Sequence, residues 1–216
     1  VAKQIRARLD PKKKRAQRAL TSSSGAAEGH GETTHLSVVD RAGNAVALTQ
    51  SIERVFGAYV ATPELGFLYN NYMSAFSRED YAHPYYLRPN GAPWASVAPS
   101  VVFRGRKLWA VLGSPGSERI VSAVSQVLLG LREKPPLEAV SAPRLHCSVH
   151  GKVSLEARRF RDDIPPRLEA RGFTLDERES ESFFLGCVQA VVRDGKTWVG
   201  VADPRRDGAA AGAKPR

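Results

Sequence analysis

The sequence predicts one α+β unit over residues 33–216, preceded by a basic segment over residues 1–32. Three observations support this. The 216 residues are 42% hydrophobic, which is enough for one core and leaves little material for a second. Three pairs of alternating segments are typical of β-hairpins. Between the second and third pairs, a glycine-containing loop leads into a segment with apolar residues at helical spacing.

The first 32 residues differ in composition from the rest. Residues 1–20 hold eight basic side chains and one acid, and so account for +7 of the formal net charge of +10. No aromatic residue is interleaved with these charges, which favours a solvated helix or tail over a nucleic-acid surface. The stretch 21–32 is small, polar and glycine-containing, and predicts a flexible linker. A linker that ends at the first strand is an easy place for cleavage.

The first hairpin begins directly after this linker. TTHLSVVD alternates, RAGN forms the turn, and AVALTQSI resumes the alternation. If Asp40 pairs with Asn44 or Ala45, then Thr33 lies opposite Ser51 or Ile52 respectively. Two hydroxyls therefore lie near each other at the open end of this hairpin.

The remaining elements follow in chain order. We expect a short strand at 66–71, a loop at 77–93, a hairpin at 100–113, a helix after the loop GSPGSE, a short helix before APRLH, a strand around 153–156, a helix ended by Gly172, and a last hairpin within 186–203. The chain then ends in an irregular tail.

Thr33 is the first candidate for chemistry. A threonine hydroxyl is a poor nucleophile unless a base lies beside it, and an N-terminal threonine supplies that base as its own α-amine. This amine titrates near pH 8, so that a useful fraction is unprotonated. Such a mechanism requires cleavage of the Glu32–Thr33 bond. By itself, however, a Thr-Thr pair at a strand start indicates ordinary strand residues.

The wider pattern is more specific. TTHLSVVDRAGNAVALTQS, Phe56-Gly57, GFLYNN, PWASVAPS, GSPGSERI, APRLH and ADPRRDG occur in this order. Together they resemble the small subunit of the γ-glutamyltranspeptidases, with residues 1–32 matching the end of the large subunit. The resemblance implies an N-terminal nucleophile hydrolase, which is a four-layer αββα sandwich cleaved by itself before the threonine. It also implies a large subunit from the same precursor, without which this chain is inactive.

The resemblance assigns the catalytic positions. It makes Thr33 the nucleophile and its freed amine the base. It places Ser51 where the family usually has a second threonine that assists cleavage. The backbone N–H groups of Gly116 and Ser117 would form the oxyanion hole, although the family usually has two glycines there. Phosphate binding by this loop is disfavoured, because GSPGSE lacks the GK[ST] ending of a P-loop.

The substrate pocket departs from the family. Glu53, Tyr72 and Ala75 stand where the family has Asn, an acidic or amide residue, and Asp, which together hold the α-amino group. Ala95 and Ser96 stand where it has two serines. Glu53 either replaces the lost counter-charge or is a surface carboxylate. The substrate is therefore a γ-glutamyl amide or, alternatively, a glutaryl-type amide without an α-amino group.

Other residues give weaker indications. His35 lies on the same strand face as Thr33, and we expect it to make structural hydrogen bonds. Cys147 and Cys187 are too few for a disulfide framework or a four-ligand metal site, and we expect both thiols to be buried or half-buried. No cofactor or metal is implied, and no apolar run has the length of a transmembrane helix. The resemblance suggests a periplasmic, secreted or cytoplasmic protein.

Two classes of function therefore follow from the sequence. The first is an amide hydrolase or acyltransferase with Thr33 as its nucleophile, acting on a small-molecule γ-glutamyl or related amide. The second is a non-catalytic or incomplete paralogue that serves as a partner subunit.

Overall fold

The computed structural model describes residues 32–212 of the chain. The predicted basic segment and flexible linker fall almost wholly on residues 1–31, outside the described residues. Among the helices within 32–212, none combines the length and the apolar character that crossing a membrane requires.

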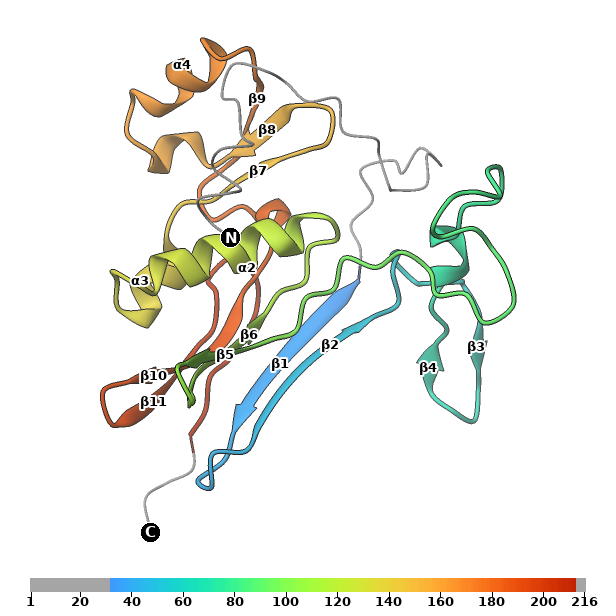
Figure 1. Ribbon diagram of the computed structural model, residues 1–216, viewed down its shortest axis with the longest axis horizontal. Coiled ribbons are helices and arrows are strands. Elements are labelled where there is room, and N and C mark those ends of the chain that lie inside the picture. The colour runs from blue at the N-terminus through green and yellow to red at the C-terminus, as the bar shows by residue number, and fades with distance from the viewer. Residues whose placement is uncertain (1–31, 213–216) are drawn as a thin grey trace.

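A four-stranded antiparallel sheet forms the centre of the structure (Figure 1). It joins two of the predicted hairpins, β5 (Ser100–Arg104) with β6 (Lys107–Gly113), and β10 (Gln189–Asp194) with β11 (Thr197–Val201). The hairpins meet through β6 and β10, where Gly113 pairs with Gln189. The strand order is β11-β10-β6-β5, so the two strands nearest the middle come from segments about a third of the chain apart.

Helices cover one face of this sheet. α2 (Arg119–Gly130) lies across it, and α3 (Pro136–Ser141) follows, beginning at a proline that suits the first helical turn. The apolar residues of α2 recur every three or four positions, and they pack against the inward side chains of β6 and β10. The resulting core consists mainly of Ala110, Leu112, Ile120, Ala123, Val124, Val127, Val140, Val188, Ala190 and Val192.

The first hairpin covers the opposite face. β1 (Thr33–Val39) pairs with β2 (Ala45–Ser51), and Thr33 lies opposite Ser51, the first of the two predicted registers. His35 packs on Gly113 so closely that a Cβ at Gly113 would lie 2.3 Å from the His35 ring. Glycine is therefore required at this position. The outer face of the hairpin is apolar and exposed, and consists of Leu36, Val38, Val46 and Leu48.

Two smaller parts flank these layers. One contains β3 (Ala61–Thr62), β4 (Phe67–Leu68) and the 3-10 turn η1 (Tyr72–Ala75). The predicted strand 66–71 is correct only at Phe67–Leu68, because the Asn70 side chain accepts a hydrogen bond from the Tyr72 N–H and starts the turn. The other part is a sheet of β7 (Leu145–Cys147), β8 (Lys152–Leu155) and β9 (Thr174–Glu177), accompanied by η2 (Ala157–Arg159), α4 (Ile164–Glu169) and η3 (Phe183–Leu185).

Cys187 is buried, as expected, but Cys147 is exposed at the end of β7, so the expectation of a covered thiol is wrong there. β7 is a short strand on the outside of its sheet. Neither thiol forms a disulfide within residues 32–212.

A buried ion-pair network joins the three-stranded sheet to the segment after β11. Glu156 is fully buried and accepts hydrogen bonds at 2.7 Å from both Nε and Nη2 of Arg205. Arg205 also contacts Asp203, which pairs in turn with Arg144. The Ser182 N–H donates to the same Glu156 carboxylate at 2.9 Å. Glu156, Asp203 and Arg205 are therefore all paired within this network, whereas Nε and Nη1 of the buried Arg144 have no hydrogen-bond partner among residues 32–212.

We predict that Glu156→Gln lowers the free energy of unfolding of the full-length protein by about 3 kcal/mol, since the buried Arg205 loses one of its two carboxylate partners and keeps only Asp203. Urea denaturation measures this loss. Asp163→Asn is the matched control, because the Asp163 carboxylate is exposed where it pairs with Arg161 and Arg167. Equal stabilities of the two variants would contradict the prediction.

Candidate active site

Thr33 and Ser51 meet at the open end of the first hairpin. Thr33 begins β1, Ser51 ends β2, and the Thr33 hydroxyl donates a hydrogen bond of 2.9 Å to Ser51 Oγ. Ser51 Oγ also donates to the Glu32 carbonyl oxygen at 3.2 Å. The structure thus brings the predicted nucleophile and its predicted partner together, next to the bond predicted to be cut.

Glu53 and Tyr72 lie beside this pair. The Glu53 N–H donates to Ser51 Oγ at 3.0 Å, and Glu53 itself has a φ of +72°, a strained conformation for a non-glycine residue. Burial raises the pKa of the Glu53 carboxyl, although Arg54 and a hydrogen bond from Tyr72 oppose this shift. Burial likewise raises the pKa of Tyr72, whose hydroxyl interacts with both Ser51 and Glu53. Two of the predicted substrate residues therefore adjoin Ser51.

The other predicted pocket residues are placed differently. Ala75 is buried at the end of η1, Ala95 is exposed, and Ser96 is half-buried in the segment before β5. Within residues 32–212, no hydrogen bond links Ala95 or Ser96 to Thr33 or Ser51. The structure does not join these two to the nucleophile.

The glycine loop lies at the same end of the layers as Thr33. His35 contacts Gly113, and β1 and β6 run in opposite directions, so the residues before His35 and those after Gly113 share one end (Figure 1). Gly116 and Ser117 have φ values of +136° and +53°. Their carbonyls accept hydrogen bonds from Arg119 and Ile120 at the start of α2. Among the described residues, neither of their N–H groups has an acceptor, as an oxyanion hole requires.

The back of this loop is fixed by residues that the sequence reasoning did not assign. Ser114 is fully buried, donates to the Pro115 carbonyl at 2.6 Å and accepts from the Cys187 N–H at 2.9 Å. A Cβ on Gly116 would lie 3.1 Å from the Gly186 Cα, so both glycines permit a close backbone approach. Asp203 completes the support by accepting from the Val188 N–H at 2.8 Å. The motifs GSPGSE and ADPRRDG indicated that both segments matter to the family, but they did not indicate that the two segments contact each other.

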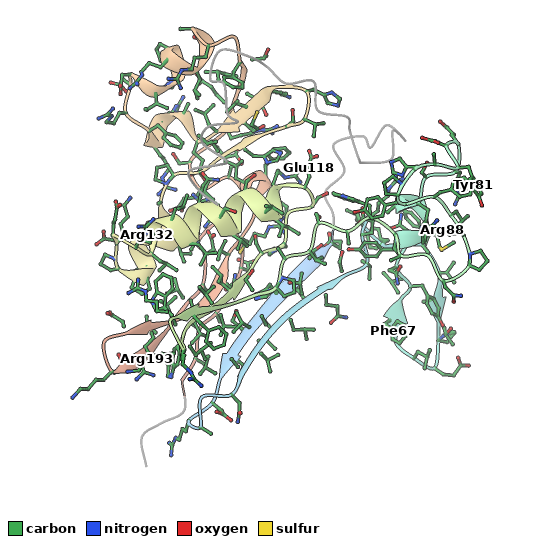
Figure 2. All side chains as sticks on the ribbon, in the orientation of Figure 1. Phe67, Tyr81, Arg88, Glu118, Arg132 and Arg193 are labelled. Carbon is green, nitrogen blue, oxygen red and sulfur yellow. The ribbon has the colours of Figure 1, made fainter. Side chains whose placement is uncertain are left out.

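Glu118 and His146 fix the front of the loop. Glu118 precedes α2, and Figure 2 shows it at the start of that helix. Its carboxylate lies 3.8 Å from His146 Nε2, and hydrogen bonding to His146 lowers the pKa of Glu118. The other ring nitrogen of His146 contacts the Ser122 hydroxyl at 2.8 Å. The loop is thereby attached to β7 as well as to α2.

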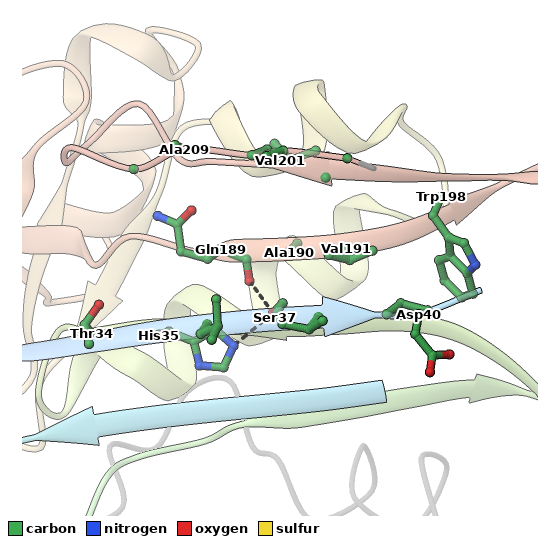
Figure 3. Close-up of a pocket in the computed structure, with 18 of the residues that line it drawn as sticks. Thr34, His35, Ser37, Asp40, Gln189, Ala190, Val191, Trp198, Val201 and Ala209 are labelled. Carbon is green, nitrogen blue, oxygen red and sulfur yellow. Dashed lines mark hydrogen bonds between the residues drawn. The ribbon is translucent and has the colours of Figure 1, made fainter. Parts of the chain in front are cut away.

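His35 makes structural hydrogen bonds, as predicted. Its Nδ1 contacts Thr49 Oγ1 at 2.7 Å and its Nε2 contacts Ser37 Oγ at 3.0 Å, while Ser37 also donates to the Gln189 carbonyl at 3.2 Å. Figure 3 shows Ser37 on β1 linked both to the carbonyl of Gln189 on β10 and to His35. Burial lowers the pKa of His35 to about 4, so the ring is neutral at pH 7. Within 32–212, no group of three His, Cys, Asp or Glu side chains gathers as a metal site.

Comparison with known families agrees with this geometry. A family model described as gamma-glutamyltranspeptidase matches residues 1–213. The glutathione hydrolase proenzyme of Escherichia coli (strain K12) is 34% identical over 190 residues, which is 81% of this chain and 31% of that protein. Glutathione hydrolase 5 proenzyme of Mus musculus is 31% identical over 221 residues, covering 98% of this chain and 38% of the relative. The chain thus spans about a third of the length of these relatives.

Solved structures give the same result. A chain of gamma-glutamyltranspeptidase from Pseudomonas nitroreducens, complexed with L-DON, has a TM-score of 0.74 and 30% identity, and the match covers 84% of this chain and 100% of that one. Cephalosporin acylase from Bacillus halodurans has a TM-score of 0.76 and 25% identity, covering 84% of this chain and 34% of that one. The predicted α+β class and the N-terminal nucleophile hydrolase fold are confirmed.

We predict that the stability of the full-length protein falls between pH 6.5 and about pH 4 through His35. The unfolded ring has the ordinary pKa of 6.5 and the folded ring one of about 4, so protons bind the unfolded state preferentially in this window. The contribution is fully present above pH 6.5 and is lost as the pH falls. The urea concentration at the unfolding midpoint, measured across this pH range, should change less with pH in His35→Gln than in wild type. Parallel slopes would contradict the assignment to His35.

Proposed function

Because the chain belongs to the γ-glutamyltranspeptidase family, we propose that it is the catalytic part of an amide hydrolase or acyltransferase whose nucleophile is Thr33. One observation carries this proposal. Thr33 Oγ1 is hydrogen-bonded to Ser51 Oγ at the start of β1, at the bond whose cleavage would free its α-amine. Residues 1–32 would then be the end of the large subunit, and residues 33–216 the small subunit.

The proposed mechanism uses groups of this chain. After cleavage, the Thr33 amine takes the proton of its own hydroxyl, and Oγ1 attacks the amide carbonyl of the substrate. The Gly116 and Ser117 N–H groups stabilise the resulting oxyanion, which is worth about 3 kcal/mol for each donor. Collapse releases the amine and leaves an acyl-enzyme on Thr33. Water or a second amine then takes the acyl group.

A large subunit from the same precursor is the partner that fits the uncovered surfaces. On the outer face of the first hairpin, Leu36 and Leu48 each expose just over half of their surface to solvent. A groove of about 820 Å³ runs beside β1, bounded by β10, β11 and residues 207–212 (Figure 3). Phe67 and Tyr81 also stand out from the part that contains β3 and β4 (Figure 2). A protein about three times as long, like the curated relatives, has the material to cover these surfaces.

The acyl group bound is proposed to be γ-glutamyl. Glu53 supports this choice, because its carboxyl accepts a hydrogen bond from Tyr72, whose hydroxyl also interacts with Ser51, and can face a substrate ammonium from there. A specific observation favours a glutaryl-type acyl group instead, since Ala75 stands where the family has Asp and offers no charge to a substrate ammonium. The likeness to a cephalosporin acylase is compatible with either choice.

A non-catalytic or incomplete paralogue is the alternative from another class. Ala75 and Ala95 replace polar residues that bind substrate in the family, and Ser117 adopts a left-handed conformation where a glycine is usual. Such a protein would keep the fold and act as a partner subunit. It differs from the enzyme in one observable property, which is the state of the Glu32–Thr33 bond.

We predict that the purified full-length protein consists of two pieces, one of which begins at Thr33, and that Thr33→Ala stays in one piece. Removing Oγ1 removes the only atom placed to attack the Glu32 carbonyl in this proposal. Intact-mass measurement of both proteins checks it. An uncut wild-type chain would leave Thr33 without a free amine and would favour the non-catalytic paralogue.

We further predict that the cleaved enzyme hydrolyses a γ-glutamyl anilide faster than the glutaryl anilide, and that Glu53→Gln raises KM for the first about tenfold through the loss of one charged interaction. The glutaryl compound is the control, because it has no ammonium for Glu53 to contact. Steady-state kinetics with both compounds measures this. Faster turnover of the glutaryl anilide would shift the assignment to a glutaryl-type acylase.

A further inference from the structure

The glycine loop holds a serine in a left-handed backbone conformation. Ser117 has a φ of +53°, a region that glycine enters freely and that an L-residue enters only at a cost. We propose that Glu118, paired with His146, is a positioning residue that holds Ser117 in this conformation and so keeps its N–H directed at the reacting carbonyl. The inference rests on the proposed function, in which the Ser117 N–H is an oxyanion donor.

The Glu118 carboxylate does not serve its own helix. Glu118 directly precedes the first residue of α2, a position where a side chain commonly accepts a hydrogen bond from an N–H of the first turn. It makes no such bond. Its carboxylate instead lies 3.8 Å from Nε2 of His146 on β7, although the Glu118 side chain is 41% exposed. A side chain that solvent can reach is therefore turned toward a buried ring on a different sheet.

The His146 ring is held so that Nε2 faces this carboxylate. Its Nδ1 lies 2.8 Å from the hydroxyl of Ser122 on α2, and its backbone pairs with Ser154 of β8. A carboxylate can only accept, so Nε2 carries the hydrogen, and Nδ1 of the neutral ring accepts from Ser122. Hydrogen bonding to His146 is the main cause that lowers the pKa of Glu118, and the carboxylate is therefore charged at pH 7.

The peptide groups on both sides of Ser117 are restrained. On the preceding side, a Cβ on Gly116 would lie 3.1 Å from the Gly186 Cα, so the two backbones are in close contact. On the following side, the Ser117 carbonyl accepts from the Ile120 N–H at 3.1 Å, and Glu118 is tied to β7. A strained residue persists only where its surroundings leave it no alternative. Release of Glu118 removes one of these restraints and lets Ser117 turn to an ordinary φ.

A glycine at position 117 would make the pair unnecessary. Glycine populates positive φ about as readily as negative φ, so a loop with two glycines keeps its second N–H in place without such a restraint. The serine needs the restraint, and Glu118 supplies it from the adjacent position. The replacement of a usual glycine by Ser117 is thus compatible with an enzyme as long as the pair with His146 is intact.

The test compares Glu118→Gln in two backgrounds of the full-length protein, with serine or with glycine at position 117. The substrate is whichever of the γ-glutamyl and glutaryl anilides the wild type turns over faster. With Ser117 present, we expect kcat to fall about tenfold at unchanged KM, the size of the penalty of the left-handed region. In the Ser117→Gly background, the same change should lower kcat by less than about twofold.

Two matched controls separate this coupling from general effects. Glu133→Gln removes an exposed carboxylate beyond the other end of α2 and should leave kcat unchanged. Asn90→Gly relieves a φ of +59° in an exposed segment, and it should not rescue Glu118→Gln. An equal loss of kcat in the serine and glycine backgrounds, or no loss in either, would overturn the role assigned to Glu118.

Hydrogen–deuterium exchange tests the same coupling without catalysis. A peptide that contains the Ile120 N–H reports whether its bond to the Ser117 carbonyl is kept. We expect this N–H to exchange about tenfold faster in Glu118→Gln than in wild type, and no faster when Ser117→Gly is also present. Unchanged exchange in Glu118→Gln would contradict the inference. A wild type that turns over neither anilide would instead overturn the proposed function, and exchange would still decide the role of Glu118.

Discussion

The close contact of His35 with Gly113 is the constraint on which the other parts of the site depend. It holds β1 against β6 where a side chain on residue 113 would prevent the approach. The hydrogen bonds of His35 to Thr49 and Ser37 then fix the hairpin itself. Because β1 and β6 run in opposite directions, this one contact brings Thr33 and the glycine loop to the same end of the layers.

The glycine loop depends on a second, more distant set of interactions. Asp203 binds the Val188 N–H, and the neighbouring Cys187 N–H binds Ser114 at the start of the loop. Asp203 itself pairs with Arg144 and Arg205. Arg205 in turn pairs with Glu156, which directly follows β8. The positions of the two backbone donors are therefore maintained by buried charges that lie outside the loop itself. Such pre-organisation is what makes fixed N–H donors effective against a developing charge.

The sequence alone predicted the three hairpins and α2, and it offered the Thr33–Ser51 pairing as one of two registers, because alternation, turn residues and the placement of glycines are local signals. The union of β6 with β10 and the parallel pair β8–β9 depend on residues far apart, and no local pattern encodes them. For the site, the strand pattern limited the residue opposite Thr33 to Ser51 or Ile52, and the structure selects Ser51. The supporting roles of Ser114, Gly186 and Asp203 arise only from packing, and the link between Ser51, Glu53 and Tyr72 requires the left-handed turn at Glu53.

The apolar outer face of the first hairpin has a consequence for handling this part of the protein. Within residues 32–212, β1 pairs with β2 alone, so its other edge is an open row of backbone donors and acceptors beside exposed leucines and valines. An open strand edge next to apolar side chains is a template for addition of further strands. This chain on its own should therefore aggregate through β1, and a protein layer that covers this edge should keep it dispersed.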